Sequence, residues 1–339
     1  MPLPDDKHRQ HTRFYSLLSI LAIVAVISFM TALVSGSVSI PLPELWQQLT
    51  SPTPGPTQQI LWEIRIPRAL AAFVCGGLLA LSGVVMQVLL RNPLADPYIL
   101  GVSGGAAVGA LAVILLGAGA LWITQAAFAG ALLSVALVFG LAARDTRWSA
   151  TRLLLTGVVI SAGWGAVINI LLTTSSGNTV QSMLFWLMGD LSQSRSQWWH
   201  FLLLAGGLAL MLSQARSLNA LARGELTAAA LGVDVKRLKL ILYFTASVLT
   251  ATAVTIAGSV GFVGLVIPHM LRLLGARDHR WLIPGSVLLG GSFLLLADSL
   301  ARTVIAPQQL PVGVLTAMIG VPAFLIILHH GYSRSRHSS

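Results

Sequence analysis

A succession of long apolar runs is the feature that most limits what this chain can fold into. About ten such runs follow one another, at 14–36, 65–89, 98–117, 120–142, 152–174, 197–215, 238–258, 260–275, 281–301 and 311–330. A helix needs about 20 apolar residues to cross a hydrocarbon core of about 30 Å. Because backbone in lipid must satisfy its own hydrogen bonds, the runs predict an all-α polytopic membrane protein with about ten transmembrane helices. The run at 260–275 is short and contains Pro268, so a bent or partly re-entrant helix is expected there.

The composition supports one membrane domain and excludes several other classes. Charged residues make up 9% of the chain, hydrophobic residues 55%, and the mean hydropathy is +0.81, whereas soluble domains carry about a quarter charged residues. We expect an N-terminal tail at 1–13, a single transmembrane domain at 14–330, and a C-terminal tail at 331–339. The first apolar run is too long for a signal peptide and is expected to be retained. The only cysteine, Cys75, excludes an internal disulfide and a cysteine metal cluster.

Basic residues predict the orientation. If the N-terminus is cytoplasmic, all but four of the 21 lysines and arginines fall on the inner side. The four exceptions are Arg65, Arg68, Arg195 and Arg302. This bias predicts that both termini are cytoplasmic. It also explains the formal charge of +10 through contact with anionic membrane lipid, so no nucleic-acid partner is expected.

Three of the exceptions lie at the outer ends of apolar runs. Arg65 and Arg68 flank Pro67, and Arg302 ends the ninth run. One interpretation is that they are exposed and extend to lipid headgroups; the other is a docking surface for an acidic partner, because arginine pairs well with carboxylates. Asp298 precedes Arg302 by four residues, so a structural pair between these two is also expected.

The inner loop at 216–239 contains a short segment bounded by glycines. Gly224 and Gly232 enclose a segment with Glu225 in its first turn and three alanines, Ala228, Ala229 and Ala230. Helix propensity and the helix dipole predict a short helix with a small-residue surface. It could lie in the lipid headgroups or fit a groove on a cytoplasmic partner.

A polar turn separates the second and third runs. Asn92 can bond backbone at a helix end, Pro93 stiffens the turn, and Leu94 is an apolar side chain able to exclude water. Without further information, these residues predict a well-capped tight turn. The third run then carries a bare face of glycines, from Gly101 to Gly109, for which close helix packing is a better explanation than a wide pore.

Several motifs, in order, resemble the FecCD-type permeases, over about residues 60 to 330. They are Arg65-Ile-Pro-Arg68, Gly83-Val-Val-Met-Gln87, Asn92-Pro-Leu-Ala-Asp-Pro97, Leu100-Gly-Val-Ser-Gly104, the 224–232 loop, Gly261-Phe-Val-Gly-Leu-Val-Ile-Pro-His269 with Arg272, Asp278-His-Arg280 with Pro284-Gly285, and Leu310-Pro-Val-Gly313. Members of this family are membrane subunits of type II ABC importers for iron chelates, haem and cobalamin. The resemblance implies ten helices per subunit and a translocation path between two permease subunits.

The resemblance also implies roles for particular residues. Arg65, Arg68 and Arg302 match positions that meet acidic residues of a periplasmic binding protein. The turn Asn92, Pro93 and Leu94 matches a cytoplasmic gate, to which Leu154, at the start of the fifth helix, is assigned as a second element. The 224–232 segment resembles the coupling helix that contacts the ATPase, through Gly224, Glu225, Leu226, Ala228, Ala229, Leu231 and Gly232.

The expected partners are a second permease subunit, most simply another copy of the chain, two ATP-binding subunits, and a periplasmic substrate-binding protein. The chain lacks the G-x-x-x-x-G-K-[ST] loop, so it is not expected to be an enzyme or to bind a cofactor, and ATP and Mg belong on the partner subunit. An ion-coupled secondary transporter is the alternative of another class, but Asp298 is its only candidate mid-membrane acid. A channel is a third class, but the sequence contains no repeated polar loop of the kind that forms a selectivity filter.

The cargo is the least constrained expectation. An iron chelate, either a siderophore complex or haem, is the first choice because it is the broadest group in the family, and cobalamin is the alternative. The resemblance implies a multi-pass protein of the bacterial inner membrane.

Overall fold

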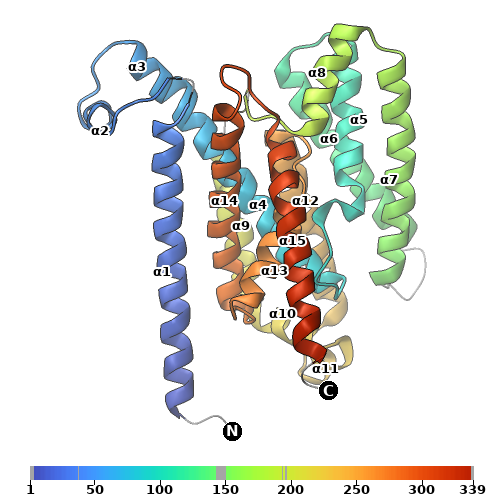
Figure 1. The fold of residues 1–339 in the computed structure, drawn as a ribbon. Helices are drawn as coiled ribbons and strands as arrows, with labels where there is room; N and C mark the ends of the chain where they lie inside the picture. Colours follow the sequence, from blue (N-terminus) through green and yellow to red (C-terminus); the bar gives the residue numbers. More distant parts are fainter. Residues whose placement is uncertain (1–3, 37, 143–149, 193, 195–196, 337–339) are drawn as a thin grey trace.

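The computed structural model describes residues 4–36, 38–142, 150–192, 194 and 197–336, and this part of the chain is built from helices without a strand (Figure 1). The all-α prediction is therefore confirmed. The longer helices are α1 (Pro4–Val34), α4 (Ile66–Leu89), α6 (Ala120–Ala142), α7 (Ala150–Thr173), α12 (Val235–Ala257), α14 (His279–Thr303) and α15 (Val312–Arg336). The shorter ones are α2 (Leu42–Thr50), α3 (Pro56–Gln59), α5 (Val102–Leu115), α8 (Gly177–Met188), α9 (Trp198–Ser213), α10 (Ala215–Ala222), α11 (Glu225–Ala230) and α13 (Val263–Leu273).

Each of the ten expected runs contains a helix, but ten full crossings are not confirmed. Within the described residues, six helical stretches are long and apolar enough to cross a membrane, and α9 with α10, bent by 62°, could form a seventh. The runs at 98–117 and 260–275 contain the 14-residue α5 and the 11-residue α13. At 1.5 Å per residue these helices are only about 21 and 17 Å long, shorter than a hydrocarbon core.

Helix α4 forms the centre of the bundle. Residues 56–89, which include α3, the π-helical turn η1 (Ile60–Arg65) and α4, are 89% buried over their most apolar window. Helices α12, α13 and α14 pack around α4. By contrast, the apolar windows of α1 and α7 are only 22% and 11% buried. These peripheral helices expose apolar side chains, as expected of surfaces that face lipid or a partner subunit.

Glycines bring the central helices into close contact. A Cβ built on Gly76 of α4 would lie 2.2 Å from the carbonyl oxygen of Gly290 in α14, and one on Gly105 of α5 would lie 2.3 Å from that of Gly130 in α6. No side chain larger than hydrogen fits at such distances. The packing interpretation of the glycine-rich third run is therefore confirmed.

The two ends of the bundle differ. Both ends of the described chain lie at the end that carries α10 and α11, whereas α2, α3 and α8 lie at the opposite end (Figure 1). This arrangement agrees with the predicted topology, in which both termini and the 216–239 loop share the cytoplasmic side. Helices α2, α3, α8 and α10 were not among the expected elements. Helix α1 also begins at Pro4, about three turns before its apolar run.

Candidate functional sites

A buried carboxylate at the outer end of the bundle binds two arginines. Asp298 of α14 is fully buried. Arg68 of α4 donates from Nε to both of its oxygens, at 3.1 and 3.0 Å, and from Nη2 to Oδ1 at 2.8 Å. Arg302 places Nε 3.2 Å from Oδ2, as an ion pair without hydrogen-bond geometry. The expected Asp298–Arg302 pair is thus confirmed, and Arg68 adds a forked partner that binds the carboxylate more tightly.

Arg65 and Arg302 stabilise the end of α1. Arg65 Nη1 donates to the carbonyls of Leu33, at 2.5 Å, and Val34, at 3.0 Å, and its Nη2 donates to the Val38 carbonyl. Arg302 Nη2 donates to the Ala32 carbonyl at 3.2 Å. The last carbonyls of a helix have no partner within it and carry its negative dipole end, so two guanidinium groups satisfy both needs.

These contacts correct one expectation about the outer arginines. Arg65 and Arg68 are 4% and 6% exposed, and the Arg302 side chain is 9% exposed. They are therefore not exposed residues extending to lipid headgroups, because each guanidinium is occupied inside the chain. Their docking role stays a prediction. Arg195, the fourth outer exception, lies outside the described residues.

The predicted gate turn follows α4. Asn92 accepts a hydrogen bond from the Leu94 N–H at 2.9 Å, and its own N–H donates to the Gln87 carbonyl at 3.1 Å, as expected of a residue that bonds backbone at a helix end. Leu94 is 39% exposed. Leu154, near the start of α7, is half-buried against the hydrophobic core. The gating role of Asn92, Pro93, Leu94 and Leu154 stays a prediction.

A short 3-10 helix, η2 (Pro97–Leu100), continues the turn. It contains Tyr98, whose role was not predicted from the sequence. Asp96 caps it by accepting from the Tyr98 N–H at 2.8 Å, and burial raises the pKa of this carboxyl to about 6. The Tyr98 hydroxyl binds both the carbonyl and the N–H of Val260, each at 3.1 Å. The hydroxyl of a buried tyrosine needs a hydrogen-bond partner. The position of Tyr98 at the start of an apolar run was therefore the sequence feature from which such a contact could have been predicted.

The segment at 224–232 is helical as predicted. Helix α11 starts after Gly224, which has a φ of 127°, and Gly232 follows it with a φ of 80°; both values favour glycine. Leu226 and Leu231 are 88% and 67% exposed, and Ala229 is also exposed. Ala228 is fully buried, so its assignment to the presented small-residue surface is wrong. It lies on the face of α11 that packs inward.

Glu225 links α11 to two other elements. Its Oε2 lies 2.6 Å from Nζ of Lys239, on α12, and its Oε1 lies 3.7 Å from Nη2 of Arg91, which directly precedes the gate turn. The Lys239 side chain is only 8% exposed, and Arg91 has an unusual φ of 48°. One carboxylate therefore joins the predicted coupling helix to the predicted gate and to the base of α12.

Comparison with known proteins identifies this arrangement. The model of the FecCD transport family matches residues 23–330. The chain belongs to the FecCD transport family. It is thus a multi-pass permease, the membrane subunit of a transporter rather than its catalytic subunit.

Relatives of this FecCD-family chain carry names from three cargo classes. It is 44% identical to the cobalamin import system permease protein BtuC of Halobacterium salinarum, over 81% of this chain and 74% of the relative. It is 40% identical to the hemin transport system permease protein HmuU of Yersinia pestis, over 94% and 97%. A solved inward-facing metal-chelate type ABC transporter matches with a TM-score of 0.80 and 32% identity, covering 93% of this chain and 99% of that one.

The described part of this FecCD-family chain offers no group of three or more His, Cys, Asp or Glu side chains that could hold a metal ion. The polar contacts found at both ends instead join helices to one another.

Proposed function

We propose that this chain is the membrane-spanning subunit of an ATP-driven importer that moves a metal chelate from a periplasmic binding protein to the cytoplasm by alternating access. The observation that carries the proposal is the contact of Glu225 with both Lys239 and Arg91. A helix that is bound to the gate turn can transmit movement from a cytoplasmic partner. The name of one relative, a cobalamin import system permease, supports the direction of transport.

The exposed face of α11 is suited to receive that movement. Leu226 and Leu231 present apolar side chains at the end of a bundle that is otherwise rich in basic residues. A groove on an ATP-binding subunit would bury these two leucines and grip the helix. When the ATPase moves, α11 would move with it. Because Glu225 of α11 pairs with Arg91 and Lys239, the gate turn and the base of α12 would then move as well.

A Glu225→Gln substitution tests this coupling. The variant keeps the size of the side chain but loses the charge that binds Lys239 and Arg91. We expect the complex with the ATP-binding subunit to assemble and hydrolyse ATP, while uptake per ATP falls at least about fivefold, because coupling free energies between sites are typically 1–3 kcal/mol. Lys236→Gln, which removes one charge from an exposed residue at the start of α12, is the matched control. Uptake equal to wild type in the Glu225 variant would remove the coupling role.

We further propose that the binding protein docks at the outer end near Arg65, Arg68 and Arg302. Arg65 allows the cleanest test, because it bonds backbone carbonyls whereas the other two neutralise buried Asp298. Arg65→Gln is expected to weaken capture of the binding protein without loss of the ATPase complex. Glu63→Gln, an exposed change two residues away, is the control. Simultaneous loss of folding and capture would instead assign Arg65 to packing alone.

The proposed assembly contains two permease subunits, two ATP-binding subunits and the binding protein, in a bacterial inner membrane. ATP and Mg would be held by the ATP-binding subunits. Uptake into proteoliposomes decides against an ion-coupled transporter if it needs ATP and persists without a proton gradient. Uptake that needs the gradient and not ATP would contradict the proposal.

An iron chelate is the first cargo candidate, and cobalamin is the second. Cobalamin is favoured by the relative that is 44% identical, and haem by the one that is 40% identical and covers more of the chain. Haem and cobalamin differ in size and charge, so a competition assay distinguishes them as cargo. Proteoliposomes containing the complex and its binding protein should accumulate one labelled cargo, and an excess of the other should not compete.

A further inference from the structure

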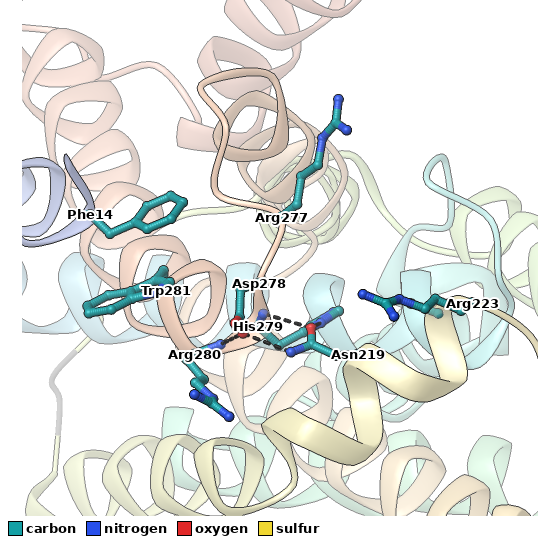
Figure 2. Close-up of a pocket in the computed structure, with 9 residues that line it drawn as sticks. Phe14, Asn219, Arg223, Arg277, Asp278, His279, Arg280 and Trp281 are labelled. Carbon is teal, nitrogen blue, oxygen red and sulfur yellow. Dashed lines mark hydrogen bonds between the residues drawn. The ribbon is translucent and has the colours of Figure 1, made fainter. Parts of the chain in front are cut away.

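A basic cavity lies at the cytoplasmic end of the bundle, between α1, α10 and the start of α14. It has a volume of about 480 Å³, and three arginines from three elements line it: Arg223 at the end of α10, Arg277 before α14 and Arg280 within it. Figure 2 shows their guanidinium groups at separate edges of the cavity, with no hydrogen bond drawn to any of them. The three guanidinium groups point in different directions in this view, so together they give the cavity a positive potential rather than a ready-made clamp around one anion.

The floor of the cavity is held rigid by Asn219. Its amide nitrogen donates to Asp278 Oδ1 at 2.8 Å, and its amide oxygen accepts from the backbone N–H of His279 at 3.0 Å and bonds His279 Nδ1 at 2.6 Å (Figure 2). These bonds fix α10 against the first turn of α14. The positions of Arg223 and Arg280 are therefore set by the fold rather than by a flexible loop.

Asp278 does not neutralise the cavity. Burial by itself would raise the pKa of this carboxyl, but the Arg280 N–H, the Asn219 amide and the nearby Arg280 and His279 charges together lower it. The group is thus a carboxylate at neutral pH, and its Oδ1 is already occupied by Asn219 and the Arg280 N–H. Among the described residues, Arg223, Arg277 and Arg280 form no ion pair. Three guanidinium groups thus remain against one engaged carboxylate.

Aromatic side chains locate the cavity at the membrane surface. Phe14 of α1 stacks on Trp281 of α14, with ring centroids 5.6 Å apart and planes at 15°, and Tyr15 meets Trp281 edge-on at 4.9 Å. Thr12–Val34 of α1 is long and apolar enough to cross a membrane, and only 22% of its most apolar window is buried. Aromatic residues favour the level of the lipid headgroups. Acyl chains beside α1 would therefore bring a headgroup to the edge of the cavity.

We propose that this cavity binds the phosphate of an anionic lipid of the inner leaflet, such as phosphatidylglycerol. The three arginines would supply the positive potential that attracts the phosphate, while Phe14 and Trp281 would contact the glycerol backbone and the first methylene groups. Arginine suits this role because its planar fork matches phosphate geometry, and basic pockets between transmembrane helices on the cytoplasmic side typically bind such headgroups. The bound lipid would join α1 to α10, next to the coupling helix.

Native mass spectrometry of the full-length chain tests the proposal. The chain, delipidated in neutral detergent, is titrated with phosphatidylglycerol or with phosphatidylcholine of the same acyl chains. We expect tighter binding of phosphatidylglycerol, and a loss of about fivefold for each guanidinium removed in Arg277→Gln and in Arg277→Gln/Arg280→Gln. Arg216→Gln/Arg237→Gln removes two exposed arginines of the same end that do not line the cavity, and it should bind as wild type.

Several outcomes would overturn the proposal. Equal binding of the two lipids, or equal loss in the control variant, would reduce the cavity to general surface charge. Binding of inorganic phosphate as tight as that of phosphatidylglycerol would indicate a soluble anion. Loss of the ATP-binding subunit in the Arg277→Gln/Arg280→Gln variant, with lipid binding intact, would assign the cavity to a protein interface. Unfolding midpoints and gel-filtration profiles show whether each variant is folded, and Arg277→Lys/Arg280→Lys, which keeps the charge, should retain part of the lipid binding.

Discussion

At the scale of single residues, the most consequential group is a carboxylate that the fold surrounds with positive charge. Asp298 is fully buried, and it neutralises Arg68 while lying next to Arg302. Removing charges from water is costly, and the cost is offset here only because the three groups are held together. The cluster connects α4 to α14 at the outer end, where the predicted docking face lies.

Removing the carboxylate should therefore destabilise the whole chain. Asp298→Asn keeps the shape of the side chain but leaves two buried guanidinium groups without a counter-charge. We expect a loss of about 3–5 kcal/mol, the range found when one partner of a buried pair is deleted. Thermal unfolding of the purified full-length chain measures it. Glu63→Gln, an exposed acid near the same helix end, should leave the midpoint unchanged; equal midpoints for both variants would contradict the proposed stabilisation.

At the scale of helices, contacts between backbones decide how the central elements cross. A Cβ on Gly83 of α4 would lie 1.9 Å from the carbonyl oxygen of Gly264, in α13. Pro97 in turn packs against Gly264, where a Cβ would meet its ring at 2.6 Å. Helices η2, α4 and α13 thus pack tightly against one another at this point. A movement of α13 therefore has to move the other two.

A methyl group at that crossing should separate the helices. Gly83→Ala is expected to cost about 1–3 kcal/mol or more, the usual penalty for overpacking. Gly163→Ala is the matched control, because a Cβ at that position on α7 would meet open space. The control should be neutral or more stable, since alanine favours helix over glycine by about 1 kcal/mol. Similar unfolding midpoints for the two variants would contradict the crossing as described.

Tyr98, in η2, connects the segment that follows the gate turn to the break between α12 and α13. Its hydroxyl satisfies both backbone groups of Val260 at 3.1 Å. Tyr98→Phe leaves an N–H and a carbonyl without that partner, so we expect a loss of about 1–3 kcal/mol. Hydrogen exchange around residue 260 should rise in the variant while exchange within α6 stays unchanged. Unaltered exchange at residue 260 would contradict this role.

At the scale of the whole molecule, the positions of α10 and α11 define which end is cytoplasmic. Most basic residues were assigned to this end from the sequence, and Figure 1 places both ends of the described chain there as well. Arg144 and Arg147, which also contributed to the predicted bias, lie outside the described residues. The orientation can be measured directly, because Cys75 is fully buried and gives a silent background for thiol labelling.

Two single cysteines should report opposite sides of the membrane. Leu226→Cys lies on exposed α11, and Ser51→Cys lies in an exposed turn after α2. In intact cells, an impermeant maleimide should label the second variant and label the first only after the membrane is opened. The wild-type chain should stay unlabelled in both conditions. The reverse pattern would invert the proposed direction of transport.

Much of the fold could be predicted from the sequence because it depends on local properties. Hydropathy over about 20 residues identified the helical class, and basic residues identified the end that carries α10 and α11. Glycines at 224 and 232 marked the limits of α11, and a spacing of four residues paired Asp298 with Arg302. The length of the short run at 260–275 already indicated an incomplete crossing by α13, whereas the length of the run at 98–117 did not reveal that α5 is too short to span.

The tertiary structure decided which groups meet across helices. Arg68 reaches Asp298 over 230 positions of sequence, and Glu225 reaches Arg91 and Lys239. It also turned Ala228 inward and buried the outer arginines. Such contacts depend on the rotation and crossing of each helix, which glycine contacts between distant backbones determine. The sequence by itself therefore determined the helical class and the short loop helix and predicted the orientation, and packing determined how the predicted gate, the predicted coupling helix and the outer arginines are connected.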